Sequence, residues 1–415
     1  MRRTRTGSNR IPADQRRAEI LRCAAELFAA RGFVPTTMDD VAEAANITKR
    51  TLYRYVPSKE DLLFEIHDTF SGHALVPSDR QDITDPTGEF RRVVRQTAQM
   101  VADHPTEIGV FFEERKHLGP AQARLIEERR DAYEAYAASV VQAGIDAGAF
   151  ADLPARTVAQ TVLGTVTEMY RWYHPDGPLS PAELADQYGD LFLHGAAAGR
   201  ALVTTRATAR PISTPAAGNS QDHRERVRLA AVKSFAEHGY HATSMRDLAD
   251  VADVTKGAVM YHAGYKNDLL EQIHRSTFQE SLSLLHEELA NDDDSTPALD
   301  SLHRLITVYM RFVAANRDAI AVINDNMRYL DTKSYRRIDR LRNDWLAIFR
   351  AVLDRAEANG EIVGVSPSFL ARALVGMFNS AARWYNPRGR LRPDALAQLF
   401  SQLLFHGLAA GVTVR

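Results

Sequence analysis

The sequence predicts an all-α fold made of two tandem copies of one unit. Apolar residues recur at helical spacing along most of the chain, and no segment alternates polar and apolar residues as a β-strand does. Residues 20–66 return without a gap as residues 227–273, with 16 identities at an offset of 207. Further on, RWYHP at 171–175 returns as RWYNP at 383–387, at an offset of 212. We therefore expect one helical unit of about 200 residues, present twice.

Bulk composition narrows the class of protein. A chain of 415 residues is long for a single core, and its 45% hydrophobic and 25% charged residues are ordinary for a soluble globular protein. No apolar run approaches the roughly 18 residues of a membrane helix, and the arginine-rich start lacks the apolar segment of a secretory signal. We therefore expect a cytoplasmic protein without a membrane partner.

The sequence gives little support for catalysis or metal binding. The single cysteine, Cys23, excludes an intrachain disulfide and a cysteine zinc site, and its place on the apolar side of a helix favours a core residue over a redox sensor. No metalloprotease, nucleophile-elbow, Walker or dinucleotide motif stands in a suitable context. His194 and His406, at matched positions, are expected to pack near an interface helix. We expect no enzyme, no catalytic residue, no cofactor and no metal site.

The chain begins with a basic arm. Residues 1–12 show no periodicity, and the first 17 residues carry six arginines against the single acid Asp14. Such an arm is attracted to phosphates and can enter a DNA minor groove, although a basic tail without a partner is the alternative. The second copy offers fewer cations before its repeat. The arginines are Arg2, Arg3, Arg5, Arg10, Arg16 and Arg17 in the first copy and Arg206, Arg210, Arg224 and Arg226 in the second.

Residues 36–63 and 243–270 each predict a helix-turn-helix followed by a lysine, and we call them the first reader and the second reader. In the first reader, Thr37 stands where a helix N-cap belongs, with Asp40 three residues on. Asn46 suits the left-handed turn, and Thr48 can cap a third helix whose Leu52 faces inward. The second of two such helices is the one that enters a major groove.

The outer faces of the two third helices differ. Aromatic and cationic side chains suit base edges and phosphates, and arginine binds guanine bidentately whereas glycine binds no base. We therefore expect an operator with unequal half-sites. Lysine at a helix start is unfavourable for the helix dipole, and a DNA phosphate near Lys59 would explain it. The candidate DNA-binding residues at and around these faces are Thr48, Lys49, Arg50, Thr51, Tyr53, Arg54 and Tyr55 in the first reader and Thr255, Lys256, Gly257, Ala258, Met260, Tyr261 and His262 in the second.

Helical patterns continue beyond each reader. The expected helices are 59–72, 88–103, 105–118, 120–147, 155–173 and 180–202, with 366–385 and 393–413 as counterparts of the last two. Residues 204–222, rich in Thr, Ala, Pro, Gly and Ser, are a linker. The acidic segment 291–297 is the obvious place for the five-residue change of offset. The expected domains are 1–66 and 223–273, which contain the two readers, and the larger helical domains 67–203 and 274–415.

The quoted segments resemble the TetR family of bacterial transcriptional regulators over nearly the whole chain. The first copy carries FAARGFxxTTM and TKRTLYRYVPSKEDLL, and the second carries FAEHGYxxTSM and TKGAVMYHAGYKNDLL. The resemblance implies a three-helix DNA-binding domain, a larger ligand-sensing domain, and dimerisation through the last two helices. By position it also implies that phosphates or bases are held by Thr37, Tyr53, Tyr55 and Lys59, and by Ser244, His262 and Lys266 in the second copy.

Two departures from the family pattern put the second reader's DNA binding in doubt. The aromatic residue that usually follows the Tyr/His position in the family is Val56 in the first copy and Ala263 in the second. In the second copy Met260 stands where the first copy has Tyr53, so a hydroxyl donor is lost. A ligand-binding or scaffold protein with one degenerate reader is therefore the alternative to a regulator that uses both. An enzyme that uses the helical-domain cavity is the least favoured interpretation.

The duplication suggests that one chain folds as a pseudo-dimer, leaving open whether chains associate further. Family members are symmetric dimers, and here helices 155–173 and 180–202 would pack on 366–385 and 393–413 as a four-helix bundle. Joining the halves by a linker makes their association intramolecular, at roughly millimolar effective concentration.

The larger domain is expected to bind an effector that releases repression. The stretch from Arg171 resembles that of lipid and sterol catabolism regulators of the family, which implies an apolar acid or a CoA thioester. Packing in the core is the alternative role for every candidate residue. The candidates are His104, Phe111, Phe112, His117, Tyr133, Tyr136, Met169 and Trp172 in the first copy, and Asn316, Ile323, Asn324, Tyr329, Trp345, Ile348, Ala381 and Trp384 in the second.

Overall fold

The computed structural model describes residues 12–75, 83–195, 223–293, 295–389 and 391–408. Within these ranges all regular structure is helical, with 18 α-helices and three short 3₁₀ turns, which confirms the all-α prediction. The chain divides into two compact units, Met1–Val76 with Thr106–Arg130, and Pro77–Pro105 with Asp131–Arg415. The basic arm before residue 12 and the predicted linker at 204–222 lie outside the described residues.

The first compact unit contains the first reader. Its helices are α1 (Ala13–Arg31), α2 (Met38–Ala44), α3 (Lys49–Leu52), α4 (Lys59–Ala74), α6 (Pro105–Glu113), the 3₁₀ turn η1 (Arg115–His117) and the start of α7 (Pro120–Asp146). The apolar positions expected from helical spacing are buried, among them Ile20, Phe28 and Leu52. Cys23 is also buried, as a core cysteine should be. The residue that ends α1 has φ 87°, an angle that residues with a side chain rarely adopt, and this explains why glycine, Gly32, stands there.

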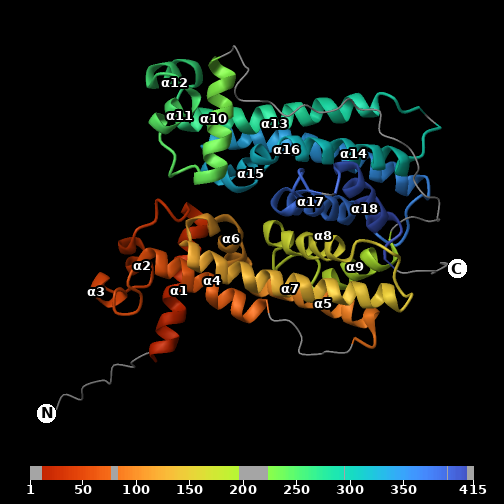
Figure 1. The fold of residues 1–415 in the computed structure, drawn as a ribbon, viewed down its shortest axis with the longest axis horizontal. Coiled ribbons are helices and arrows are strands. Elements are labelled where there is room, and N and C mark those ends of the chain that lie inside the picture. The colour runs from red at the N-terminus through yellow and green to blue at the C-terminus, as the bar shows by residue number, and fades with distance from the viewer. Residues whose placement is uncertain (1–11, 76–82, 196–222, 294, 390, 409–415) are drawn as a thin grey trace. The chain divides into compact units, whose positions relative to one another are not determined.

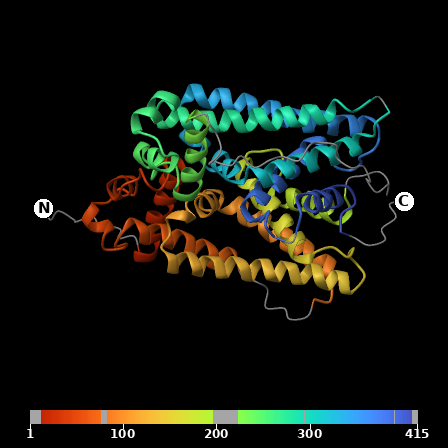
Figure 2. The same ribbon diagram turned by 45° about the horizontal axis from the view of Figure 1, so that its top comes forward.

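The first part of the second copy, which contains the second reader, repeats this order inside the second compact unit. Its helices are α10 (His223–His238), α11 (Met245–Ala252), α12 (Lys256–Ala263) and α13 (Lys266–Leu289), and α13 packs along α16 (Thr332–Ala358) (Figure 2). The third helices differ in length. In the first reader α3 ends at Leu52, so the expectation that Tyr53, Arg54 and Tyr55 cover the outside of this helix was wrong. Tyr53 N–H still donates to the Lys49 carbonyl, while Arg54 and Tyr55 lie in tight turns with i−3 hydrogen bonds.

The remaining helices keep a constant offset of 212 between the copies. In the first copy they are α5 (Pro86–Asp103), α7, α8 (Ala155–Thr167), the turn η2 (Glu168–Arg171) and α9 (Pro181–His194). In the second they are α14 (Ala298–Ala315), α15 (Arg317–Asn326), the turn η3 (Met327–Tyr329), α16, α17 (Pro367–Trp384) and α18 (Pro393–Phe405). The residue numbers of α5 and α14 already differ by 212, the larger of the two offsets. The additional residues of the second copy therefore lie before Ala298, which is consistent with the acidic segment 291–297.

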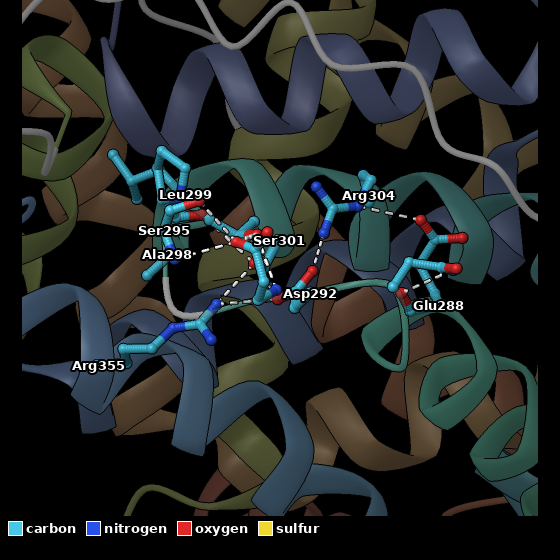
Figure 3. Close-up of polar contacts among 12 residues, drawn as sticks. Glu288, Asp292, Ser295, Ala298, Leu299, Ser301, Arg304 and Arg355 are labelled. Atoms are coloured by element: carbon cyan, nitrogen blue, oxygen red, sulfur yellow. Dashed lines mark hydrogen bonds and ion pairs between the residues drawn. The ribbon is translucent and has the colours of Figure 1, made fainter.

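Ion pairs tie Asp292 of this segment to α14 and α16 (Figure 3). Arg304 of α14 pairs with the buried Glu288, at 3.1 Å, and with Asp292. Arg355 of α16 reaches the same Asp292 at 3.0 Å. Each carboxylate in this cluster therefore faces a guanidinium, as burial of charge requires, and the cluster has a structural role.

Helices from the two copies pack on each other within the second unit. α8 lies against α17 and α9 against α18 (Figure 1). Two pairs of matched glycines mark the crossings. A Cβ at Gly164 would lie 2.5 Å from the Cβ of Ser380, and one at Gly376 would lie 3.1 Å from Thr165. At the helix ends, Gly195 abuts the Phe405 carbonyl and Gly407 abuts Leu193, which is a two-fold relation between equivalent residues.

Several predicted helices were too long. α9 ends at His194 instead of 202, and α18 at Phe405 instead of 413, because Gly195 (φ 73°) and Gly407 (φ 66°) leave the helical region where the two chain segments meet. Leu408 N–H then donates to the Phe192 carbonyl at 2.8 Å. The helix expected over 155–173 tightens into η2 from Glu168, and the helix expected over 105–118 ends at Glu113 before η1. Among the described residues, no helix is long and apolar enough to cross a membrane.

Candidate nucleic-acid interface

The turn of each reader has the left-handed backbone that its sequence predicts. Asn46 has φ 50° and Asp253 has φ 53°, and they are the only non-glycine residues with positive φ in the described ranges. The residue after the turn hydrogen-bonds to the helix that precedes the turn. Ile47 N–H donates to the Ala42 carbonyl at 2.9 Å, and Val254 N–H donates to the Ala249 carbonyl at 3.0 Å. The two readers therefore have the same turn between their second and third helices.

The predicted N-caps are also present. Thr37 and Asp40 form a capping box, in which Asp40 N–H donates to Thr37 Oγ1 at 3.2 Å and Thr37 N–H donates to Asp40 Oδ2 at 2.7 Å. Hydrogen bonds from Thr37 lower the pKa of Asp40. Ser244 and Asp247 repeat the box in the second reader, and Thr48 and Thr255 cap the third helices through Thr51 N–H and Ala258 N–H. The Thr37 hydroxyl also donates to the Asp40 carboxylate, so within this cap it is both a hydrogen-bond acceptor and a donor.

Two arginines are the accessible cations of the first reader. Arg50 and Arg54 are exposed and have no carboxylate partner within the described ranges. Lys49, by contrast, pairs with Asp39 of α2 at 2.8 Å, and that hydrogen bond raises the pKa of the lysine. Tyr53 is 46% exposed beside them. This face thus presents two arginines and an aromatic ring to the outside.

The second reader presents a different set of side chains. Met260 and Tyr261 are 43% and 85% exposed, and Lys256 is exposed with no carboxylate partner among the residues that the structure describes. His262 is half-buried, because its ring stacks on His223 at 5.6 Å and its carbonyl accepts from Arg224 Nε at 3.1 Å.

Two of the second copy's arginines have internal partners. Arg226 donates to the carbonyls of Ala252 and Asp253, both at 2.9 Å, and so braces the turn, while Arg224 holds the His262 carbonyl. Both arginines, counted among the cations of the second copy, are thus engaged with carbonyls of its helix-turn-helix. Arg206 and Arg210 lie outside the described residues.

Comparison of the copies reveals a charge exchange that the sequence reasoning missed. Asp39, which neutralises Lys49, corresponds to Arg246, an exposed residue in the first turn of α11. The second reader thus gains a cation on the helix that precedes its third helix, while it lacks arginine on the third helix itself. A position-by-position comparison of the second helices would have found this exchange.

The lysines after the third helices have partners inside the protein. Lys59 Nζ donates to the carbonyls of Phe33, Val34 and Thr36 at 2.8, 3.1 and 2.9 Å, and lies over the Phe33 ring. Lys266 donates to the His241 carbonyl at 3.2 Å and lies over Tyr240. Burial lowers the pKa of both lysines. These carbonyls explain the cation at the helix start without an anion, and phosphate contact remains a prediction.

Some of the predicted ligand residues pack against the readers. The His117 ring stacks on Phe33 at 5.2 Å, and Tyr329 stacks on Tyr240 at 5.5 Å. Phe33 and Tyr240 are the rings that lie under the two lysines. In each copy an aromatic stack therefore links the 3₁₀ turn of the larger domain to its reader.

Other candidates form packed cores. Phe111 lies against His67 and Phe70 at 5.4 and 5.2 Å, with Phe112 at 5.3 Å. His67 and its counterpart His274 are fully buried, each with Nδ1 on the carbonyl four residues earlier and no partner for Nε2 in the described residues. Burial lowers the pKa of both imidazoles to about 4, so both are neutral at pH 7.

The central positions of the two larger domains differ most. In the second copy, Tyr309, Trp345, Phe349 and Phe378 form a cluster of buried rings, with Tyr309 centroids 4.9 Å from Trp345 and 4.5 Å from Phe378. The rings pack against one another there as in a protein core. The corresponding residues of the first copy are smaller or hydroxylated, and they are Thr97, Tyr133, Ala137 and Val166.

Polar groups accompany these smaller residues in the first copy. The hydroxyls of Thr97 and Tyr133 are 3.3 Å apart, and burial raises the pKa of Tyr133. Tyr136 hydrogen-bonds the buried carboxylate of Glu89, and Arg92 donates to the Tyr136 hydroxyl at 2.7 Å. Tyr133 and Tyr136 are therefore two predicted ligand residues that make buried or half-buried polar contacts in the first copy.

The remaining candidates occupy helix ends, the core or the packing between the copies. Trp172 lies under the Arg372 guanidinium of α17, and the Asn324 carbonyl accepts a hydrogen bond from Arg171. Asn316 and His104 are the C-cap residues of α14 and α5. Trp384 Nε1 is buried and lacks a partner in the described residues. The others are buried in the core, and they are Met169, Ala381, Ile323 and Ile348. Since most of these side chains already have packing partners, they do not define one pocket.

Curated relatives each match about one copy of the chain. The HTH-type transcriptional repressor KstR2 of Rhodococcus jostii (strain RHA1) is 26% identical over 204 residues, which make up 48% of this chain and 97% of that protein. KstR2 of Mycobacterium tuberculosis (strain CDC 1551 / Oshkosh) is 29% identical over 189 residues, 44% of this chain and 93% of that protein.

Solved structures also match about half of the chain. PfmR from Thermus thermophilus has 26% identity, covers 46% of this chain and 100% of its own, and has a TM-score of 0.42. AibR in complex with isovaleryl coenzyme A and operator DNA has 20% identity, covers 44% of this chain and 98% of its own, and has a TM-score of 0.41.

Family profiles match both copies. The profile "Bacterial regulatory proteins, tetR family" matches residues 20–66 and 228–273, and the profile "Tetracyclin repressor-like, C-terminal domain" matches residues 84–196 and 295–408. These segments contain both helix-turn-helix backbones and both sets of larger-domain helices. The chain belongs to the TetR family of bacterial regulatory proteins, and it carries the unit of that family twice.

Proposed function

We propose that the chain is a transcriptional repressor that binds DNA as a single-chain pseudo-dimer, on an operator with two unequal half-sites. The observation that carries this proposal is the combination of two equal helix-helix turns with two unequal outer faces. Asn46 and Asp253 give both readers the same turn, whereas the exposed side chains on and after the third helices differ. The KstR2 relatives are named as repressors, which supports repression over activation.

The packing of α8 on α17 and of α9 on α18 supports the pseudo-dimer. Family members dimerise through their last two helices, and here the equivalent helices of the two copies meet within one chain. The matched glycines at the crossings are the mark of a two-fold interface. A second chain is then not needed to present two readers to DNA.

The charges on the readers support unequal half-sites. Arg50 and Arg54 can bind guanine bidentately, while Gly257 and Tyr261 stand at the corresponding positions of the second reader. Lys256 and Arg246 provide phosphate-binding cations there, which argues against a degenerate second reader. The alternative, a scaffold protein with one inactive reader, predicts that changes in the second reader leave DNA binding intact.

Selection of binding sites from random duplexes tests the operator. The proposal expects a site whose two halves differ in sequence. Lys256→Ala should weaken binding to the whole site and leave the base preference of the first half unchanged. A perfectly two-fold symmetric site would contradict the unequal half-sites, and wild-type affinity of Lys256→Ala would favour the scaffold alternative.

We also propose that the effector is an apolar acid or a CoA thioester and that it binds in the first copy. The polar contacts of Tyr133 and Tyr136 lie there, while rings fill the equivalent place in the second copy. Titration of the protein–operator complex with saturated acyl-CoA thioesters of increasing chain length tests this. Release of DNA that is lost in Tyr133→Ala and retained in Trp345→Phe supports the first copy as the sensor.

A further inference from the structure

A buried carboxylate lies where α8 passes into η2. Glu168 is 2% exposed, and three side chains contact it. Arg383 pairs with its Oε1, while Arg171 Nε and Asn379 Nδ2 donate to its Oε2 at 3.1 and 2.9 Å. Arg171 belongs to the same copy as Glu168, whereas Arg383 and Asn379 belong to α17 of the second copy. One carboxylate thus joins both copies at the centre of their packing.

The carboxylate is ionised in this environment. Burial alone would raise the pKa of Glu168, but the guanidinium groups of Arg383 and Arg171 outweigh burial and hold the pKa below its usual range. An ionised group at such a position depends on its counter-charges, since a buried charge left without a partner is strongly unfavourable.

The two-fold relation between the copies is broken at the position of Glu168. Arg171 corresponds to Arg383 and Gly164 to Gly376, but the counterpart of Glu168 is Ser380. The Ser380 hydroxyl donates to the Met377 carbonyl of its own helix at 3.0 Å, so it supplies no counter-charge to either arginine. Arg171 also lies 4.0 Å from Asp325 of the second copy, but that carboxylate is partly exposed. The buried carboxylate between the two arginines therefore comes from the first copy.

We propose that Glu168 selects the second copy of the chain as the partner of the first copy. This inference rests on the proposed pseudo-dimer and deepens it. Pairing of a first with a second copy places one carboxylate between the two arginines. Pairing of two second copies would place Arg383 against another Arg383 with two serines and no buried carboxylate, leaving only the partly exposed Asp325 near each arginine. That arrangement leaves two buried like charges poorly compensated and is disfavoured.

The consequence concerns assembly between chains. Two first copies would bring two carboxylates and two arginines, which is balanced, but this pairing would leave both second copies without a compatible partner. Open chains of molecules, in which each copy pairs with a neighbour of its own kind, are thereby disfavoured. The linker adds a high effective concentration for the heterotypic pair within one molecule. Glu168 thus favours a molecule that closes on itself.

Amide hydrogen exchange of the full chain tests this role. Glu168→Gln keeps the shape and the acceptor for Asn379 but removes the charge. We expect exchange in α8 and α17 to accelerate at least about tenfold, because the cross-copy ion pair is lost. Glu271→Gln is the matched control: Glu271 is also a largely buried partner of an arginine, Arg337, but both lie away from the contacts between the copies. It should leave exchange in α8 and α17 unchanged.

A double-mutant cycle keeps the test decisive if one variant is poorly folded. Glu168→Gln/Arg383→Gln removes both charges, so it should exchange more slowly in α8 and α17 than Glu168→Gln alone. Additive effects of the two substitutions, or equal exchange in wild type and Glu168→Gln, would overturn the role of Glu168. Failure of the pseudo-dimer itself is a separate result: the wild-type chain would then be found only as a dimer of chains by sedimentation.

Discussion

At the scale of single residues, the charge exchange between Asp39 and Arg246 makes the two readers electrostatically unequal. Asp39 holds Lys49 at 2.8 Å, whereas Lys256 has no carboxylate partner in the described part of the chain. Each lysine that meets a phosphate contributes about 0.9 to the slope of log K against log salt. We expect Lys256→Ala to lower that slope by nearly one, and Lys49→Ala to lower it by clearly less. Equal changes, measured by titrations at several salt concentrations, would show that the Asp39 pair does not persist on DNA.

Arg50 carries the sharpest prediction for base recognition. It is exposed, without a carboxylate partner in the described ranges, and at the start of α3. Arg50→Ala should cost about 1–3 kcal/mol of specific binding and relax base preference in one half-site only. Competition between duplexes mutated in either half measures this. A uniform loss for both halves would assign Arg50 to phosphate contact.

The buried histidines predict a dependence of stability on pH. His67 and His274 have folded pKa values of about 4, below the unfolded value of about 6.5. A depressed pKa means that the unfolded chain binds the proton first, so stability is complete above pH 6.5 and falls as the pH drops toward 4. Each histidine accounts for up to about 3 kcal/mol of this loss. His67→Asn should flatten the profile of unfolding free energy between pH 4 and 6.5, and an unchanged profile would contradict this account.

Lys59 shows where residue-level prediction from sequence stops. Caps and turns such as Thr37 and Asn46 could be predicted because their partners lie within four residues along the chain. The carbonyl partners of Lys59 lie 23 to 26 residues away, and the Glu168–Arg383 pair spans 215 residues. Such contacts depend on tertiary packing, so the sequence suggested a phosphate for Lys59 where the structure has carbonyls.

At the scale of helices, α8 and α17 cross so closely that glycine is required. A Cβ at Gly164 would lie 2.5 Å from the Ser380 Cβ, whereas one at Gly72 of α4 would meet its nearest neighbour at an ordinary 3.5 Å. Gly164→Ala should therefore destabilise the chain by about 1–3 kcal/mol despite the better helix propensity of alanine. Gly72→Ala should be neutral or stabilising. Urea unfolding of both variants measures the difference, and equal stabilities would mean that the crossing yields easily.

Helix existence was predictable, and helix ends were less so. Periodicity found every helix of the larger domain of the first copy, since each has an apolar face. It overran α9 and α18, because the glycines that end them, Gly195 and Gly407, are fixed by contact with the other copy. It also extended the third helix of the first reader beyond Leu52. Local pattern cannot show where another segment of the chain interrupts a helix.

At the scale of the whole molecule, duplication makes a symmetric family architecture asymmetric. The turns of the two readers and the matched glycines between the copies are alike, so fold and pairing keep a two-fold relation. The reader faces, the aromatic core of the second copy and Glu168 differ. When both copies lie on one chain, a substitution in one copy is not repeated in its partner. It therefore does not need to be compatible with a second copy of itself. Each copy is therefore free to take on a separate role in DNA or effector binding.

The stoichiometry of the DNA complex tests the central claim most directly. The mass of the protein–operator complex can be measured by sedimentation or mass photometry, at protein concentrations on either side of the dissociation constant. The single-chain pseudo-dimer predicts one chain of 46.3 kDa per operator at all concentrations, with half-sites that differ in sequence. Two chains on each operator, with affinity that weakens on dilution as chains separate, would contradict it.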